Sequence, residues 1–248
     1  MSNDVSIFLQ CYEHDFHVFS DEHNLNTKIN YSNYNFVKKI LIITNIIDRK
    51  TKEIQVQNLL RKKIIDSFYF VDDYKKEILD YFDLSEESFN GGYWYSIGPL
   101  SAVYFCDTKY MLYLTSDSLI ENKKVPWIDD AINMFELNDK IISANPLWNI
   151  DHEGALLEQP DNQKIIDLGF FDTNIWYYNQ VFSDQCFLIP TEYYKKKIYN
   201  EKNTKSEYKY PSYAGNSFEK RVHSHMINNN LYRITNKNIN YYHPRYHY

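Results

Sequence analysis

The fold is decided by one stretch near the middle of the chain, Lys109-Tyr110-Met111-Leu112-Tyr113-Leu114-Thr115-Ser116-Asp117-Ser118. The residues from Tyr110 to Leu114 are all apolar or aromatic, and small polar residues and one acid follow at once. An apolar run of this length, bounded by turn formers, predicts a strand that is buried on both faces. Ligands of open α/β sheets bind outside the carboxyl ends of such strands. The stretch therefore predicts that Asp117 lies at the mouth of a binding crevice.

Further strands are predicted on both sides of this one. Apolar runs occupy Val5–Cys11, Lys39–Asn45, Ser67–Val71, Lys140–Ala144 and Gln185–Ile189, and a final run begins at Leu231. Helical patterns occupy 55–63, 74–82, 93–105, 127–137, 192–200 and 217–229. Because strand and helix alternate in the first half, we expect an α/β fold with a mostly parallel central sheet flanked by helices, in a single domain.

Three polar segments interrupt this pattern. Residues 21–34 have no clear period, which predicts a loop or an irregular helix. Asn145-Pro146 is expected to close the strand before it. Residues 203–211 are polar, and we expect them to form a mobile segment.

Composition excludes several classes of protein. The net charge is -6 and no long basic run occurs, which argues against binding to duplex nucleic acid. No stretch of about 18 apolar residues occurs, so no membrane span is expected. Cys11, Cys106 and Cys186 are odd in number and far apart, which predicts buried thiols rather than disulfides. Because no signal-peptide pattern precedes the first strand, we expect a cytoplasmic protein.

The chain is rich in aromatic residues, with 24 Tyr, 15 Phe and 4 Trp among 248 residues. One explanation is genomic bias, since Asn, Lys, Ile and Tyr are abundant together. The other is function, because sugars stack their apolar faces on aromatic rings. Composition alone leaves both explanations open.

The order of these segments resembles the glycosyltransferases of the GT-A fold, and most nearly their large family-2-like group. Val5–Tyr12 resembles the first strand, whose end contacts the nucleotide, and Ile40–Arg49 resembles the second strand with its acidic turn. Gly91–Ser118 resembles the helix that leads into the "DxD" strand. The resemblance implies a nucleotide-sugar-binding half at about 1–120 and an acceptor-binding half at about 121–248.

The resemblance continues in the second half. Phe182–Ile189 resembles the strand that lines the acceptor side, and Phe218–Arg221 resembles the "ED" motif at the start of a late helix. His243 resembles the C-terminal histidine that completes the metal site of many members. The sequence also departs from the family pattern. Thr115 replaces the first acid of "DxD", Gln10-Cys11-Tyr12-Glu13 replaces Pro-Thr-Tyr-Asn, and Glu219 is the one acid of the "ED" motif.

The resemblance implies that Asp117 and His243 bind a divalent cation that holds the donor diphosphate. Mg²⁺ prefers oxygen ligands and Mn²⁺ tolerates nitrogen better, so this pair favours Mn²⁺ slightly. Two structural alternatives stand beside this role. Asp117 could cap a turn, and His243 could be an ordinary residue of the aromatic tail 241–248. The tail itself is expected to dock on the protein as a simple terminus, to cover the active site, or to contact a lipid-linked acceptor at a membrane surface.

An inverting transferase also needs a general base that takes the proton of the acceptor hydroxyl. Glu219 is the first candidate, in the first turn of a predicted helix where the helix dipole favours an ionised carboxylate. The same position suits an acid that only stabilises the helix after the cap residue Ser217. Asp184, at the start of the acceptor-side strand, is the second candidate base, and its alternative is a polar loop residue.

The donor is expected to contact residues at the ends of the early strands and on the helix before Asp117. The candidates are Gln10, Tyr12, Asn45, Asp48, Tyr93, Ser96, Gly98, Ser116 and Asp117. Each of the first four is equally explained as a turn residue.

Together these features predict an enzyme that transfers a sugar from a nucleotide-sugar donor to a saccharide or lipid-linked saccharide acceptor, in surface polysaccharide or glycan synthesis. One alternative is a nucleotidyltransferase-type nucleotide-sugar enzyme, which would need a glycine-rich phosphate loop that is not seen in residues 5–30. The other is a catalytically inactive carbohydrate-binding relative, suggested by Thr115.

Overall fold

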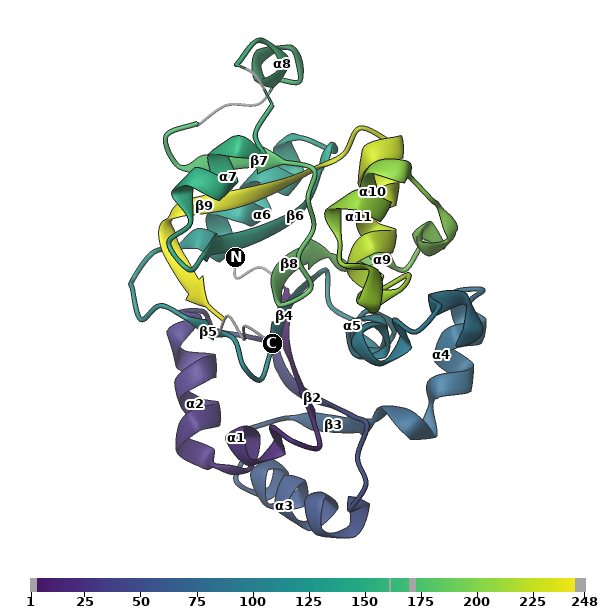
Figure 1. The fold of residues 1–248 in the computed structure, drawn as a ribbon. Helices are drawn as coiled ribbons and strands as arrows, with labels where there is room; N and C mark the ends of the chain where they lie inside the picture. Colours follow the sequence, from purple (N-terminus) through teal and green to yellow (C-terminus); the bar gives the residue numbers. More distant parts are fainter. Residues whose placement is uncertain (1–3, 161, 170–172, 244–248) are drawn as a thin grey trace.

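The computed structural model describes residues 4–160, 162–169 and 173–243, and it arranges their strands in one sheet with helices on both faces (Figure 1). The strand order is β3-β2-β1-β4-β8-β6-β9-β5, and β7 also pairs with β9. The strands are β1 (Val5–Tyr12), β2 (Lys38–Thr44), β3 (Ser67–Phe70), β4 (Tyr110–Thr115), β5 (Leu119–Ile120), β6 (Ile141–Trp148), β7 (Trp176–Asn179), β8 (Cys186–Pro190) and β9 (Tyr232–Tyr242).

The helices fall into two layers. The α-helices are α1 (Phe16–Ser20), α2 (Glu22–Tyr31), α3 (Arg49–Arg61), α4 (Lys75–Tyr81), α5 (Tyr93–Phe105), α6 (Trp127–Leu137), α7 (His152–Leu157), α8 (Asn162–Asp167), α9 (Thr191–Tyr194), α10 (Thr204–Lys209) and α11 (Phe218–Asn228). Short 3-10 turns are η1 (Val71–Asp73), η2 (Glu87–Phe89), η3 (Ile198–Asn200) and η4 (Ser212–Ala214). Helices α1, α2, α3 and α6 pack on one core, and α4, α5, α9 and α11 pack on the other.

The first half of the sheet is parallel, as predicted. Strand β1 lies between β2 and β4, and Leu9 pairs with both Leu41 and Leu114, all three fully buried. Successive side chains of β1 alternate between the two cores, with Leu9 on one side and Phe8 on the other. A strand with helices on both faces must be apolar throughout. This explains the continuous apolar runs and confirms the predicted α/β fold.

Strand β8 joins the two halves, because it runs antiparallel to both β4 and β6. Strand β6 continues through Asn145 and Pro146 to Trp148, so the prediction that these two residues end the strand is wrong. A proline lacks the N–H that a ladder needs, and the pairing of β6 with β9 shifts register after Pro146. The local irregularity allows the strand to pass the proline.

Two of the polar segments are helical. Residues 22–31 form the regular helix α2, whose cap residue Asp21 accepts a hydrogen bond from the His23 amide at 2.8 Å. The segment that we expected to be mobile contains α10, whose cap residue Asn203 accepts from the Lys205 amide at 2.9 Å. Apolar residues do not recur at helical spacing in either segment, and both predictions relied on that signal alone. Each helix is instead indicated by the strong cap residue at which it begins.

The cysteines agree with the prediction from composition. Cys11, Cys106 and Cys186 are all buried and free. Among the described residues, we find no helix with the length and apolar character that a membrane crossing requires.

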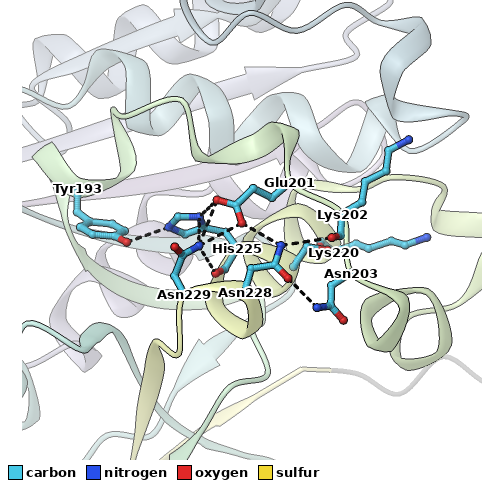
Figure 2. A network of polar contacts seen from close by, with 9 residues as sticks. Tyr193, Glu201, Lys202, Asn203, Lys220, His225, Asn228 and Asn229 are labelled. Atoms are coloured by element: carbon cyan, nitrogen blue, oxygen red, sulfur yellow. Dashed lines mark hydrogen bonds and ion pairs between the residues drawn. The ribbon is translucent and has the colours of Figure 1, made fainter.

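Helix α11 is fixed near its C-terminal end by a polar network centred on Glu201 (Figure 2). The Glu201 carboxylate accepts hydrogen bonds from the side-chain amides of Asn228 at 2.9 Å and Asn229 at 3.1 Å, and it contacts Nδ1 of His225. Nε2 of His225 lies 2.9 Å from the Tyr193 hydroxyl. The network ties the C-terminal end of α11, the helix that carries Glu219 in its first turn, to the segment after η3.

We expect Glu201→Gln to destabilise the protein at pH 7 by about 1–2 kcal/mol, a few degrees in melting temperature. Burial by itself would raise the pKa of Glu201, but hydrogen bonds from Asn228 and His225 outweigh it and hold the pKa below its ordinary value. A carboxyl whose pKa is lower in the folded state than in the unfolded state stabilises the folded protein when it is ionised. This stabilisation is complete at pH values above the unfolded pKa of about 4.3, and it is lost as the pH falls through the folded pKa. Thermal melts between neutral pH and about pH 3.5 should therefore show the two proteins converging.

The control is Glu192→Gln, which changes a carboxylate with an 83% exposed side chain, paired with Lys195. Its melting temperature should stay within error of the wild type at every pH. If the melting temperature of Glu201→Gln is lower than that of the wild type by the same amount in acid as at neutral pH, the carboxylate charge is not the source of the stability.

Candidate active site

Asp117 and His243 meet at the carboxyl end of β4. Nε2 of His243 lies 3.0 Å from Oδ2 of Asp117. They meet because β5, just after Asp117, pairs antiparallel with the end of β9, with Leu119 opposite Tyr242. Asn149 fixes the histidine backbone through two hydrogen bonds, of 2.9 and 3.1 Å. The pairing of two distant motifs is thus a direct consequence of the sheet topology. Residues 244–248 of the aromatic tail lie outside the described residues.

The Asp117 carboxylate is charged at neutral pH. Partial burial would raise its pKa, but hydrogen bonds from His243 and Thr115, together with the charge of His243, outweigh burial and hold the pKa below its ordinary value. Its side chain keeps 36% of its surface exposed. Asp117 is therefore an ionised group at the rim of the sheet that a ligand can reach.

Sequence reasoning missed two charged neighbours of Asp117. Asp15, in the turn after β1, accepts hydrogen bonds from the Ser116 hydroxyl and from the Tyr12 amide. Burial, with the charge of Asp117, raises the pKa of Asp15 to about 6. Lys28 of α2 is 7% exposed and donates to the Ser118 carbonyl. Burial lowers the pKa of Lys28 to about 8, although Asp117 and Asp15 oppose the shift. A second carboxylate and a buried cation therefore adjoin the predicted "DxD" place.

The residue in the place of the first "DxD" acid closes the turn. The Thr115 hydroxyl lies 2.8 Å from Oγ of Ser118 and 3.3 Å from the carbonyl of Gln185. Ser116 is buried, and its amide donates to the Gln10 carbonyl at 2.9 Å. These contacts hold the turn that presents Asp117.

Four predicted donor-binding residues lie at the ends of β1 and β2, on the same sheet edge as Asp117. Gln10 bridges neighbouring strands, since its amide donates to Thr44 at 3.0 Å and accepts from the Tyr113 hydroxyl at 2.9 Å. Tyr12 is 40% exposed. Asn45 has a positive φ of 55°, and Asp48 caps α3 through the Thr51 amide. Donor contact by these residues stays a prediction.

The other three candidates lie on α5, and all are buried. The Ser96 hydroxyl donates to the Gly92 carbonyl at 2.6 Å and accepts from the Phe218 amide at 2.8 Å, which anchors the start of α11. A Cβ at Gly98 would lie 3.0 Å from Cγ of Gln10, so glycine permits the close approach of α5 to β1. Tyr93 packs edge-on against Phe89. These residues shape the site, and direct contact with the donor is untested.

The two candidate bases, Glu219 and Asp184, are neighbours in space. Burial and the charge of Asp184 raise the pKa of Glu219 far above its ordinary value. Burial also raises the pKa of Asp184 to about 6; the charge of Asp117 adds to this effect and that of His243 opposes it. Asp184 is thus within electrostatic reach of both Glu219 and the Asp117–His243 pair. These charge interactions link the two candidate bases to the Asp117–His243 pair.

A cavity of about 280 Å³ opens beside Glu219. Strands β6 and β9 form much of its wall, which includes the aromatic rings of Trp148, Tyr210 and Tyr241. Arg233, also on the wall, was not among the residues predicted from the sequence. Aromatic rings with a few polar groups suit a saccharide, because a sugar has both apolar faces and hydroxyls.

The described residues contain no cluster of three His, Cys, Asp or Glu side chains with the geometry of a metal site. Asp117 and His243 nevertheless suit a cation that is shared with a ligand. Nε2 of His243 and Oδ2 of Asp117 form a direct ion pair at 3.0 Å, so a cation held by both side chains would replace the contact between them. A carboxylate oxygen with an imidazole nitrogen is a donor set that Mn²⁺ accepts.

Comparison with known proteins gives matches in structure alone. No family model and no curated protein matches the sequence. A structure of GalNAc-T7 with UDP, GalNAc and Mn²⁺ matches with a TM-score of 0.58 and 8% identity, over 97% of this chain and 43% of that chain. The mannosyltransferase PcManGT from Pyrobaculum calidifontis, with GDP-Man and Mn²⁺, matches with a TM-score of 0.53 and 9% identity, over 100% of this chain and 59% of that chain.

The chain therefore spans about half the length of these two structures, at identities that bear on fold alone. The likeness covers the whole sheet of this chain, with its parallel β3-β2-β1-β4 order and the antiparallel β8 that follows it. The chain has the GT-A fold.

Proposed function

We propose that this chain transfers a sugar from a nucleoside-diphosphate donor to a saccharide acceptor. The observation that carries the proposal is that Glu219 lines an aromatic-rich cavity and interacts with the charge of Asp184, which in turn interacts with the charges of Asp117 and His243. One end of this arrangement suits a diphosphate and the other suits a sugar hydroxyl. A general base between them is what sugar transfer requires.

In the proposed reaction, Glu219 accepts the proton of the acceptor hydroxyl while the oxygen attacks the anomeric carbon of the donor. The bond from that carbon to the diphosphate oxygen breaks, and the nucleoside diphosphate leaves with the electron pair. Burial and the charge of Asp184 favour the protonated form of Glu219, whereas the charge of Arg233 favours the ionised form that can accept a proton. Asp184 is the neighbouring alternative base.

The leaving diphosphate gains negative charge, which the site must stabilise. Asp117 and His243 would hold a divalent cation, Mn²⁺ or Mg²⁺, together with the diphosphate. When bound, that cation supplies electrostatic stabilisation of the leaving group. Residues 1–120 would form the donor half and residues 121–248 the acceptor half of one domain.

The natural acceptor that we propose is a saccharide or lipid-linked saccharide of surface polysaccharide or glycan synthesis in the cytoplasm. Trp148, Tyr210 and Tyr241 on the cavity wall support a sugar ligand, since aromatic side chains suit the apolar parts of a sugar.

Thermal-shift measurements with UDP, GDP and their sugar conjugates, each with and without Mn²⁺, test the proposal. A ligand at about 100 times its Kd adds about 2.7 kcal/mol of stability, a shift that is easily measured. We expect one nucleoside diphosphate to stabilise the protein, and to do so more strongly with Mn²⁺. Response to a nucleoside triphosphate alone would favour a nucleotidyltransferase instead.

Thr115 favours one competing function, a catalytically inactive carbohydrate-binding protein, because the first "DxD" acid is absent. Asp15 lies near that place but its carboxylate is engaged by Ser116 and Tyr12. Stabilisation by oligosaccharides, with no response to any nucleotide, would support this function and contradict sugar transfer.

A further inference from the structure

Arg233 of β9 is a buried cation that lacks direct hydrogen-bond partners on part of its guanidinium group. The residue is 7% exposed and lines the cavity that also contains Glu219. Its Nε is fully buried with no hydrogen-bond partner. A terminal nitrogen lies 3.7 Å from a carboxylate oxygen of Glu158, which is an ion-pair distance beyond hydrogen-bond range. A buried donor without an acceptor is costly, so a bound ligand would gain by supplying one.

The surroundings of Arg233 add further positive charge. A second hollow, of about 470 Å³, shares Glu158, Val181 and Lys209 with the first and is also lined by Lys205. His223 lies on the wall of this second hollow, and its pKa reflects the positive charges around it. Burial lowers its pKa to about 4, and the charges of Lys209, Arg233 and Lys205 add to the shift. The second hollow is also lined by Lys164, so its three lysines outnumber Glu158 and favour an anion. In the first hollow, Arg233 and Lys209 lie with three carboxylates, those of Asp151, Glu158 and Glu219.

We propose, on the basis of the proposed sugar transfer, that the acceptor carries an anionic group, a carboxylate or a phosphate, which Arg233 binds. The planar guanidinium offers parallel N–H donors that match the oxygens of either group. Arg233 and Glu219 line the same cavity, so a sugar whose anion binds Arg233 would have its hydroxyls in the space that Glu219 lines.

Glu158 does not prevent this binding. Its other carboxylate oxygen lies 2.5 Å from Nζ of Lys209, so Glu158 keeps a close cationic partner when Arg233 binds a ligand. The donor diphosphate is assigned to a different place, at Asp117 and His243 beyond Asp184. Arg233 is therefore a specificity-determining residue for the acceptor.

Binding of D-glucuronate, D-glucose 6-phosphate and D-glucose, measured by titration calorimetry with the full chain, tests the proposal. We expect at least one anionic sugar to bind about 10-fold or more tightly than neutral glucose, since each charged hydrogen bond adds about that factor. The carboxylate and phosphate probes distinguish the two sources of anion. Glucose binding as tightly as both anions would overturn the proposal without any variant.

The matched variants are Arg233→Gln, Arg233→Lys and Arg61→Gln. Arg233→Gln should weaken binding of the anionic sugar by about 10- to 100-fold and leave the affinity for glucose unchanged. Arg233→Lys keeps the charge but loses the planar N–H donors, so its affinity for the anionic sugar should lie between those of Arg233→Gln and the wild type. Arg61 is an exposed arginine of α3 and serves as the control that loses the same charge. Undiminished anion binding by Arg233→Gln would overturn the assignment.

Failure of this inference can be told from failure of sugar transfer. Binding of UDP and GDP with Mn²⁺ is measured in the same proteins, and the Arg233 variants should match the wild type there. A wild type that binds a nucleoside diphosphate but no anionic sugar would retain the proposed function and refute the anionic acceptor. A wild type that binds an anionic sugar but no nucleotide would refute the transferase instead.

Discussion

Glu219→Gln should reduce kcat by about 10²–10⁴-fold, the usual contribution of a general base. The amide has nearly the size of the carboxylate but cannot accept the proton of the acceptor hydroxyl. Glu219 belongs to the first turn of α11, which Ser96 and the Glu201 network hold in place, so the variant should keep the fold. Turnover with the cognate donor and acceptor measures the effect, and the Kd for nucleoside diphosphate should change by less than about twofold.

The control for Glu219→Gln is Glu192→Gln, another first-turn glutamate, on α9 and with an exposed side chain. Glu192→Gln should retain full turnover. This result would show that loss of an acid from the first turn of a helix does not by itself reduce activity. Full turnover by Glu219→Gln would show that Glu219 only stabilises its helix.

Asp184→Asn separates the two candidate bases. If Glu219 is the base, removal of the Asp184 charge should lower the pKa of Glu219 and reduce turnover less than Glu219→Gln does. A larger loss for Asp184→Asn, with near-normal turnover of Glu219→Gln, would transfer the role to Asp184.

The strands that carry the site could be predicted because burial on both faces leaves a strong local signal. Strand β4 is a continuous apolar run up to Thr115, and strand β1 is apolar except for Ser6 and Gln10. Helix α2 and helix α10 lack that signal, and only their cap residues indicate them. Local pattern therefore predicted the central sheet better than its surroundings.

The partners of Asp117 show what a single sequence leaves out. The contact with His243 followed from the resemblance, and the pairing of β5 with β9 now explains it. Asp15 and Lys28 gave no such signal, because nothing local says that the turn after β1 and a face of α2 meet at Ser116 and Ser118. Their roles depend on tertiary packing alone.

Arg233 illustrates the same limit in the second half of the chain. In sequence it is one polar residue in a strand that begins at Leu231, and alternation along the strand would place it on either face. The parallel pairing of β9 with β6 and its antiparallel pairing with β7 bury it beside the cavity. The feature that marks it is a buried Nε with no hydrogen-bond partner, and only coordinates can reveal this.

Asp117→Asn should reduce turnover by about 10²–10³-fold, the range expected when one group that stabilises transition-state charge is lost. The amide keeps the size of the side chain but removes the charge that a divalent cation requires. Mn²⁺-dependent binding of the nucleoside diphosphate should weaken by about 10-fold or more, and calorimetry with and without Mn²⁺ measures this separately from turnover. His243→Gln should weaken the same Mn²⁺ dependence, since both side chains would share the cation.

The fold should tolerate Asp117→Asn, because the side chain is 36% exposed and a partly exposed ion pair contributes about 0–1 kcal/mol. Asp107→Asn is the matched control, since Asp107 lies before β4, at the opposite end of the strand from Asp117, where it pairs with Lys38. It should leave turnover and Mn²⁺ dependence unchanged. If Asp117→Asn binds the nucleoside diphosphate with undiminished Mn²⁺ dependence, the cation does not lie at this edge. The buried Lys28 would then be the remaining positive group of α2 beside Asp117, and Lys28→Met should reduce diphosphate binding in its place.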